Sequence, residues 1–554
     1  MNIRNAYLGV VLFLLAGGCA QVRDTWRQSA DAIEGAPRQR LANDLHAALH
    51  GLDGRGATLA ARVVDLQTGQ VLFEENPDLA VIPASNGKLA ISAAGLDLFG
   101  PAHTFKTWLV TDGDDLWIVG SGDPGTGDAR IEGKRNRQVT SVFDDWTAAL
   151  KRRGITRVQG NLYYWDGAFD DQLVHPNWRK DFLVDWYAAP VSGLNFNDNC
   201  IDVVAHPAEE GQPARLEITP PNSVARVTNK TVTGGTDKVE ITREPDAPSF
   251  TVVGGITKET KYESKPITDP GAFFAHAFRT HATAAGIQFD GQTIRAATLP
   301  FDPTGPMITR VVAVHETSIR DVLWRINKNS QNLFAEALSK AMGREMAYRR
   351  GQSVPGSWSL GEEAARAFLA RNGIDTGQYV AADGSGLARE NRVTSRLISD
   401  LLVLMHRHPY GKVWRDSLAV GGVDGTIGKR QKDIAGRIMA KTGYIRGVRS
   451  LSGYARTMDN RMLAFCFIYN DIEGDVKPYE NLQDQACRVL VYWPKKAPRV
   501  APEPATAPAA EPTTSPATQP DDAATQPTDS TPQVEDATTQ PIYIPAPTPG
   551  DGAR

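Results

Sequence analysis

One stretch decides the fold of this chain: Ile82-Pro83-Ala84-Ser85-Asn86-Gly87-Lys88-Leu89-Ala90-Ile91-Ser92-Ala93-Ala94. The proline and the apolar run after Lys88 predict a helix that begins near Ser85. Residues three apart share a helix face, so Lys88 is expected one turn from the Ser85 hydroxyl. A serine hydroxyl is a poor nucleophile at neutral pH and needs a base within hydrogen-bond reach. The stretch therefore predicts a serine nucleophile with a lysine base.

A second lysine motif, Lys441-Thr442-Gly443, lies in a predicted strand. Residues 448–455 and 462–469 read as the next two strands, so we expect an antiparallel arrangement with the motif on an edge. Lysine acts as a base only when its pKa is lowered, and burial together with a second ammonium would do this. Lys441 is the predicted second cation for Lys88.

The residues around Lys441 suit substrate binding. Lys441 and the Thr442 hydroxyl could hold a carboxylate, and Gly443 would let a substrate backbone approach closely. The N–H of Tyr444, paired with that of Ser85, would form an oxyanion hole.

A third motif, Ser330-Gln331-Asn332, separates two runs with helical apolar spacing. It is predicted to occupy a tight turn between two helices. There Ser330 could relay a proton to a leaving amine, and Asn332 could bind the substrate backbone.

Each motif alone has an ordinary explanation. Ser-x-x-Lys at a helix start is usually a cap followed by a solvated lysine, Ser-Gln-Asn is usually turn chemistry, and Lys-Thr-Gly is usually an exposed loop. For all three to arise by chance in this order and context, we allow only about a few per cent. The combination therefore indicates an active site.

The context of the three motifs resembles one family. Asp383-Gly384-Ser385-Gly386-Leu387-Ala388-Arg389, Gly421–Ile427 and Gly120–Pro124 resemble loops of the D-alanyl-D-alanine carboxypeptidase/endopeptidase family, the class C low-molecular-mass penicillin-binding proteins. The resemblance runs from about Ala42 to about Trp493. It implies an α/β (α+β) fold: a penicillin-recognising serine transpeptidase/β-lactamase-like domain with a large strand-rich insertion between the first and second motifs.

The resemblance also implies roles for individual residues. The catalytic residues would be Ser85 as the acylated nucleophile, Lys88 as its base, Ser330, Asn332, Lys441 and Tyr444. The substrate-binding residues would be Thr442, Gly443, Arg389, Trp178 and Asp181.

Three of these assignments carry open alternatives. Some members of the family bind a diaminopimelate side chain with a Trp-x-x-Asp stretch, which Trp178-Arg179-Lys180-Asp181 matches in spacing. The equal alternative is that Arg179 and Lys180 are a solvated pair of charges. Arg389 would bind either the substrate or the second-motif loop. Gln331 stands where relatives often have Asp, at a variable position.

Composition restricts the function further. The chain has 554 residues, 41% of them hydrophobic, a net charge of -4 and ten histidines scattered along it. This charge balance implies no basic face for nucleic acid. No His–Cys cluster with metal spacing is evident, and no metal or other cofactor is expected. Cys466 and Cys487 could pair, but buried thiols are the favoured prediction.

The N-terminus predicts export. A short basic start precedes the apolar run Ala6–Leu15, which is too short to span a membrane, and Ala16-Gly17-Gly18-Cys19 resembles a bacterial lipobox. We expect a periplasmic protein attached to the outer membrane by lipid on Cys19; cleavage after Ala20 is the alternative.

The chain divides into five predicted parts. Residues after 500 are dominated by Pro, Ala, Thr and Gln, a composition that predicts disorder. The parts are a signal peptide (1–19), a spacer (20–40), a catalytic domain (41–101 plus 300–496), an inserted strand-rich domain (102–299) and a disordered tail (497–554).

The predicted function is hydrolysis of peptidoglycan stem peptides at D-Ala-D-Ala or at the D-alanyl cross-link, through a Ser85 acyl-enzyme that β-lactams would also form. Two alternatives stay open: a β-lactam hydrolase, and a non-catalytic peptidoglycan-binding or antibiotic-sensing protein.

Overall fold

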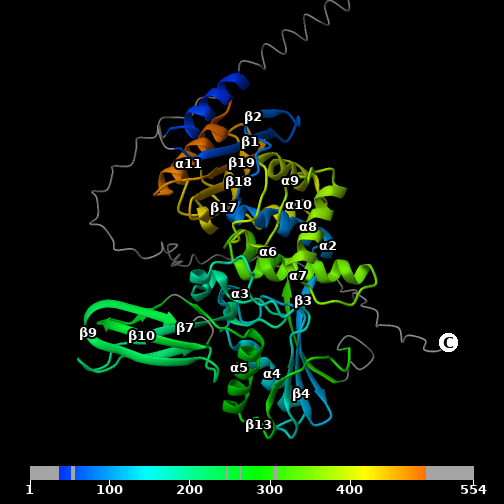
Figure 1. Cartoon of the computed structure of the whole chain (residues 1–554), viewed down its shortest axis with the longest axis vertical. Helices are drawn as coiled ribbons and strands as arrows, with labels where there is room; N and C mark the ends of the chain where they lie inside the picture. The colour runs from blue at the N-terminus through cyan, green and yellow to red at the C-terminus, as the bar shows by residue number, and fades with distance from the viewer. Residues whose placement is uncertain (1–36, 52–55, 245–246, 263, 303–309, 495–554) are drawn as a thin grey trace, which may run out of the picture. The chain divides into compact units, whose positions relative to one another are not determined.

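A six-stranded antiparallel sheet lies at the centre of the part that carries the serine motif (Figure 1). The structure is a computed structural model and describes residues 37–51, 56–244, 247–262, 264–302 and 310–494. The strand order β16-β17-β18-β19-β1-β2 places the N-terminal hairpin beside the C-terminal strands. The strands are β1 (Thr58–Asp65), β2 (Val71–Glu75), β16 (Ala419–Val420), β17 (Ile438–Ile445), β18 (Val448–Arg456) and β19 (Met462–Asn470).

Two helices cover one face of this sheet. They are the helix over residues 37–49 and α11 (Lys477–Tyr492), and their apolar side chains form a core with the sheet. Leu41, Leu45 and Leu49 recur every four residues and are buried there, as expected for an amphipathic surface helix.

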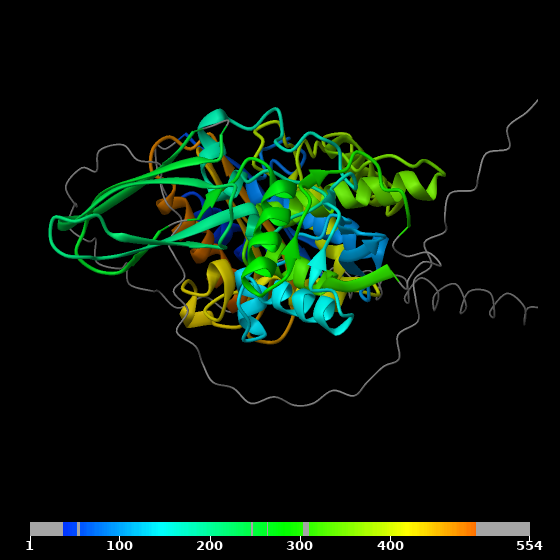
Figure 2. The same cartoon turned by 90° about the horizontal axis from the view of Figure 1, so that it is seen from below.

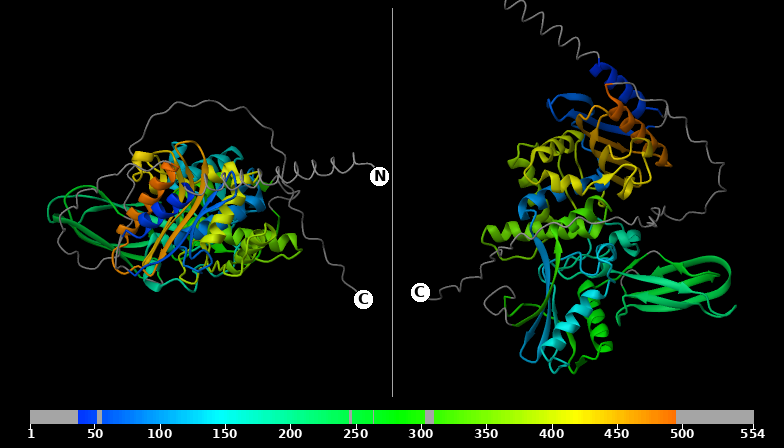
Figure 3. Two further views of the ribbon diagram at one scale, coloured as in Figure 1. Left: turned by 90° about the horizontal axis from the view of Figure 1, so that it is seen from above. Right: turned by 180° about the vertical axis from the view of Figure 1, so that it is seen from behind.

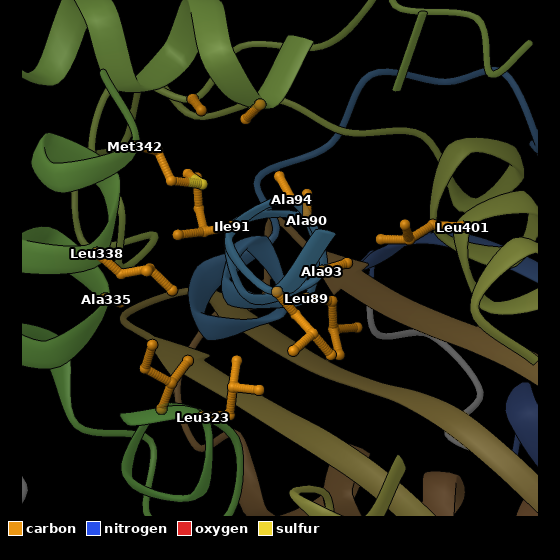
Figure 4. Close-up of a cluster of buried hydrophobic side chains, with 14 of the residues drawn as sticks. Leu89, Ala90, Ile91, Ala93, Ala94, Leu323, Ala335, Leu338, Met342 and Leu401 are labelled. Atoms are coloured by element: carbon orange, nitrogen blue, oxygen red, sulfur yellow. The ribbon is translucent and has the colours of Figure 1, made fainter. Parts of the chain in front are cut away.

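The other face carries the catalytic helices, and α2 (Lys88–Phe99) lies in their middle. Figure 4 shows Leu89, Ile91 and Ala93 of α2 surrounded by side chains of the neighbouring helices. A helix that is apolar all round is stable only when it is enclosed, which explains the run that follows Lys88. Its neighbours are α6 (Ile319–Asn327), α7 (Asn332–Arg349), α8 (Trp358–Arg371), α9 (Ser395–Arg407) and α10 (Gly411–Asp416).

The segment between the first and second motifs builds a second sheet, of order β14-β6-β4-β3-β15. It packs on α4 (Ser141–Arg152) and α5 (Pro270–Ala284) through a separate apolar core. The last strand lies beyond residue 300, so this sheet extends past the junction expected from the sequence. Its strands are β3 (Thr104–Asp112), β4 (Asp115–Gly120), β6 (Leu162–Trp165), β14 (Thr293–Arg295) and β15 (Val311–Ser318).

Longer strands extend away from this second sheet, as Figures 2 and 3 show. β9 (Arg226–Arg243) bends at Gly234 and Gly235, whose positive φ angles suit glycine, so that both its halves pair with β10 (Ser249–Ile256). The remaining elements here are α3 (Ala129–Lys134), β5 (Arg157–Val158), β7 (Cys200–His206), β8 (Arg215–Thr219), β11 (Thr260–Lys261), β12 (Lys265–Pro266) and β13 (Gln288–Phe289).

The three described cysteines are free and buried, as the favoured prediction had it. Cys466 faces the catalytic helices, whereas Cys487 belongs to the core on the opposite face of the sheet. The sheet therefore separates the two thiols that the sequence left open as a pair. Within the described ranges, no helix is long and apolar enough to cross a membrane. Cys19, the predicted signal peptide and the tail lie outside the described residues.

Candidate active site

Ser85 lies on a 3-10 turn, Ala84–Gly87, that continues directly into α2. The α-helix thus begins three residues later than predicted, but the turn keeps Ser85 above Lys88. The turn packs tightly against the loop at Gly386, where a Cβ atom would come within 1.9 Å of the Ala84 carbonyl oxygen. Gly386 also has a φ of +84°, so both sterics and backbone conformation require glycine there.

The Lys88 ammonium is enclosed by three oxygen acceptors. Its Nζ lies 2.9 Å from Ser85 Oγ, 2.7 Å from Asn332 Oδ1 and 2.8 Å from the Ser385 carbonyl oxygen. A neutral amine would still donate its two hydrogens to Asn332 and Ser385, which leaves the nitrogen lone pair facing Ser85. The geometry is therefore suited to removing the Ser85 proton.

Burial tunes this lysine toward the neutral form. Lys88 is fully buried, and the loss of hydration lowers its pKa to about 7, against the opposing charges of Glu336 and Asp383. Burial also lowers the pKa of Lys441 well below its ordinary value, and the charge of Lys88 lowers it further. Burial is therefore the dominant cause for both lysines, and the prediction that the charge of Lys441 lowers the pKa of Lys88 is not confirmed, because the charge effect acts on Lys441 instead.

Lys441 joins the third motif to the second. Its Nζ donates to Ser330 Oγ at 2.7 Å and to the Thr442 carbonyl oxygen at 2.8 Å. Ser330 lies between α6 and α7 with a φ of +61°, in the tight turn that the sequence predicted. The Thr442 hydroxyl donates to Thr426 Oγ1 at 2.9 Å. The structure thus brings Ser330 and Lys441 into direct contact.

β17 passes directly beside the serine turn. Asn86 Nδ2 donates to the Lys441 carbonyl oxygen at 2.9 Å, and Ser450 Oγ donates to the Pro83 carbonyl oxygen at 2.8 Å. A Cβ atom on Gly443 would lie 3.0 Å from Ser85 N, so Gly443 is needed for the approach of the strand itself. β16 pairs only with Met439 and Ala440, and the motif therefore lies on the open part of the edge.

Tyr444 follows Gly443 on this strand, where it pairs with Arg449 of β18. The Arg449 guanidinium lies over the Tyr444 ring, 5.4 Å from its centroid. The side chain is thus placed by the neighbouring strand, while the proposed contribution of Tyr444 to an oxyanion hole rests on its backbone N–H.

Residues of the inserted segment form hydrogen bonds with the second motif. Asn332 Nδ2 donates to the Tyr187 carbonyl oxygen at 2.7 Å, and Gln331 Nε2 donates to Asp198 Oδ2 at the same distance. Arg325 donates to Asp198 and, through Nε, to Asp128. Asn332 thus serves in the structure as a link between Lys88 and the inserted segment, beyond the substrate contact expected of it.

Two buried carboxylates that the sequence did not single out organise the loop after α8. Glu336 accepts hydrogen bonds from the Gly384 and Ser385 amides and from Trp358 Nε1. Asp383 accepts from the Gly386 and Ala388 amides, at 2.7 Å and 2.6 Å. Together they aim the Ser385 carbonyl at Lys88. The Asp383–Arg389 stretch of the sequence could have pointed to Asp383. Glu336 lies in a helical run in which no sequence pattern distinguishes it.

Trp178 and Asp181 lie in different environments and have different partners. Trp178 is buried, and its Nε1 donates to Asp383 Oδ2 at 2.9 Å. Asp181 is exposed and forms an ion pair with Arg179, with 2.6 Å between Nη2 and Oδ2. Asp181 is thus paired with Arg179 in this structure, and Trp178 supports the Asp383 loop.

Arg389 contacts the third-motif hairpin rather than the second-motif loop. Its Nη1 donates to the Arg446 carbonyl oxygen at 2.8 Å, in the turn between β17 and β18. Arg179, Arg389 and Arg446 line one cavity together with Asp471 and Glu473. In this cavity Arg389 could bind an anionic group of a substrate.

The fold and this geometry define a serine-dependent hydrolase of the penicillin-recognising class, in which a buried lysine faces the serine. The chain belongs to the D-Ala-D-Ala carboxypeptidase 3 (S13) family, whose model matches residues 41–489.

Individual relatives agree with this assignment. The chain is 30% identical over 500 residues to a D-alanyl-D-alanine carboxypeptidase of Actinomadura, covering 85% of this chain and 88% of the relative. It is 23% identical to a D-alanyl-D-alanine carboxypeptidase of Haemophilus influenzae, over 76% of this chain and 87% of that one. Among solved structures it is similar to penicillin binding protein 4 of Haemophilus influenzae, with a TM-score of 0.66, 20% identity and coverage of 80% of this chain and 97% of that one.

Proposed function

We propose that this chain hydrolyses D-alanyl peptide bonds in peptidoglycan stem peptides through an acyl-enzyme on Ser85. One observation carries the proposal: Lys88 Nζ, buried and with a pKa lowered to about 7, lies 2.9 Å from Ser85 Oγ. Membership of the S13 family supplies the reaction class.

The proposed acylation begins when neutral Lys88 takes the Ser85 proton as Ser85 Oγ bonds to the carbonyl carbon of the D-alanyl residue. The amides of Ser85 and Tyr444 would stabilise the oxyanion. The C–N bond then breaks, and the proton that Lys88 accepted passes to the leaving amine through Ser330, which Lys441 contacts at 2.7 Å, so that Lys88 is neutral again. Water completes the cycle by hydrolysing the ester, with release of the peptide acid and the Ser85 hydroxyl.

β-Lactams would acylate Ser85 by the same attack, because their strained amide occupies the place of the scissile bond. We propose that Thr442 and Gly443 bind the substrate carboxylate and backbone beside β17, and that Arg389 and Asp181 bind groups farther along the stem peptide. We also propose that residues 102–299 act as an accessory domain that supports the second motif.

The test uses the full chain with a diaminopimelate pentapeptide ending in D-Ala-D-Ala and with cross-linked muropeptides, and it reads product masses. Loss of one alanine would show carboxypeptidase activity, and splitting of the muropeptide dimer would show endopeptidase activity. Ser85→Ala should abolish both, whereas Ser353→Ala, at an exposed loop position, should retain both. Intact peptides with the unmodified chain would contradict the proposal, and rapid turnover of penicillin in their place would favour a β-lactam hydrolase.

We further propose that the protein is exported and anchored to the outer membrane through lipid on Cys19. The support is the apolar run followed by Ala16-Gly17-Gly18-Cys19. Expression in a bacterium fed labelled palmitate should label the protein, and Cys19→Ser should remove the label. A labelled Cys19→Ser variant would contradict the anchor.

A further inference from the structure

Two histidines and a carboxylate meet at the sheet edge opposite the serine cleft. His46 and His50 are four residues apart on the N-terminal helix, and Glu75 ends β2. β2 forms one edge of the six-stranded sheet, whereas β17 with Lys441 lies next to the other edge. The three ligand atoms lie within 4.8 Å of one another. The cluster is therefore separate from the machinery described above.

The distances suit coordination of one ion. His50 Nε2 lies 3.0 Å from both carboxylate oxygens of Glu75, and His46 Nδ1 lies 3.7 Å from Glu75 Oε2. In a tetrahedral Zn²⁺ site with bonds of about 2.0–2.1 Å, the ligand atoms are about 3.3 Å apart. The two separations between a histidine nitrogen and a Glu75 oxygen bracket that value, and all three ligand atoms lie within 4.8 Å of one another, so small side-chain rotations would bring them onto one sphere.

The backbone on both sides of the cluster is held in place. Leu45 and Leu49, each next to one histidine, are buried in the core, and this sets the face on which His46 and His50 lie. Tyr469 Oη donates to the Leu49 carbonyl oxygen at 2.7 Å, which fixes the end of the helix. Ala61 pairs with Glu75 across the β1–β2 ladder. Little backbone entropy would remain to be lost on binding.

The cluster is also accessible to solvent. The side chains of His46, His50 and Glu75 are 65%, 42% and 25% exposed. An ion could thus reach them directly, and a water molecule could complete its coordination. Two imidazoles and one carboxylate form a ligand set that zinc commonly takes in proteins.

We propose that His46, His50 and Glu75 bind one Zn²⁺ ion, which joins the N-terminal helix to the edge strand β2. The sequence predicted no metal site, because histidines four apart on a surface helix are common and Glu75 is brought to them only by the fold. The site supplies no group to the Ser85 reaction.

The experiment titrates chelator-treated full chain with Zn²⁺ in a calorimeter and follows thermal denaturation in parallel. We expect one Zn²⁺ per chain and a higher denaturation midpoint when Zn²⁺ is present. His46→Gln, His50→Gln and Glu75→Gln should each weaken binding by at least about tenfold, the smallest loss typical even of outer-shell partners. Acylation of Ser85 by a fluorescent penicillin should be the same with and without Zn²⁺, and it reports on folding of every variant.

A matched control is available at His206. Its two ring nitrogens face Glu217 and Glu259, each at 3.2 Å, in opposite directions, so the three residues cannot converge on one ion. His206→Gln should therefore bind Zn²⁺ as the unmodified chain does. The proposal is overturned if the unmodified chain takes up no Zn²⁺, or if folded His46→Gln and His50→Gln variants bind it equally well. It is also overturned if His206→Gln alone removes binding.

Discussion

Gln331 Nε2 donates a 2.7 Å hydrogen bond to Asp198 Oδ2, across 133 positions of the chain. Gln331 is the middle residue of the second motif, between the two residues that contact Lys441 and Lys88. Asp198 in turn accepts from Arg325. The inserted segment is therefore tied to the catalytic turn through Gln331, the second-motif residue with no assigned chemistry, as well as through the contact of Asn332 with Tyr187.

Gln331→Met is expected to slow acylation by a fluorescent penicillin about 10- to 100-fold, because displacement of a catalytic group by about 1 Å costs rate on that scale. The φ of +61° at Ser330 needs the surrounding contacts to be maintained. Gln378→Met, at an exposed position, is the control and should acylate normally. Unchanged kinetics in folded Gln331→Met would show that the turn keeps its conformation without the hydrogen bond to Asp198.

The acylation rate should rise with pH through about 7, because only neutral Lys88 accepts the Ser85 proton and burial lowers its pKa to about 7. At pH 5 the rate should be about one hundredth of its plateau above pH 8. Stopped-flow measurement of penicillin acylation tests this. Lys88→Arg, which keeps a positive charge but cannot give up its proton, should lose about 10²–10⁴-fold. A rate independent of pH between 5 and 8 would exclude Lys88 as the base.

Gly443→Ala should impair acylation strongly. The added Cβ would lie 2.1 Å from Ser450 Oγ, 2.9 Å from the Pro83 carbonyl oxygen and 3.0 Å from Ser85 N, so β17 must move away from the serine. Gly133→Ala is the matched control, since nothing lies within 4 Å of a Cβ there. Penicillin binding by both variants, normalised to folded protein, makes the comparison. Equal binding would mean that the strand accommodates the methyl group without disturbing Ser85.

Arg325→Met should destabilise the fold by about 3–5 kcal/mol, because it leaves the buried carboxylate of Asp128 without its partner. Arg157→Met removes the exposed pair with Asp290 and should leave the denaturation midpoint nearly unchanged. Thermal denaturation of the two variants under identical conditions compares these effects. Similar midpoints would show that the Arg325 network adds little to stability.

Trp178→Phe should slow acylation by penicillin and by stem peptides alike, because it removes the hydrogen bond to Asp383 and loosens the loop that holds Lys88. Asp181→Asn should leave penicillin acylation unchanged and weaken only substrates whose side chain reaches the exposed carboxylate. The ratio of kcat/KM for the two substrate types separates these roles. A loss confined to stem peptides in Trp178→Phe would instead place its ring against the substrate.

The sequence by itself determined the features that depend on short-range periodicity. Helical spacing puts Lys88 one turn from Ser85, and apolar continuity marks α2 and β19 as buried. The order of the three motifs then led to the fold and the reaction class.

Only the tertiary structure decided how distant residues meet. Lys88 contacts Asn332 across 244 positions of the chain, and Trp178 donates a hydrogen bond to Asp383 across 205. That burial lowers the pKa of Lys88 against the opposing charges of Glu336 and Asp383 also emerged there. Such contacts and burial arise from the packing of whole layers against one another, and residue spacing along the chain carries no record of that packing.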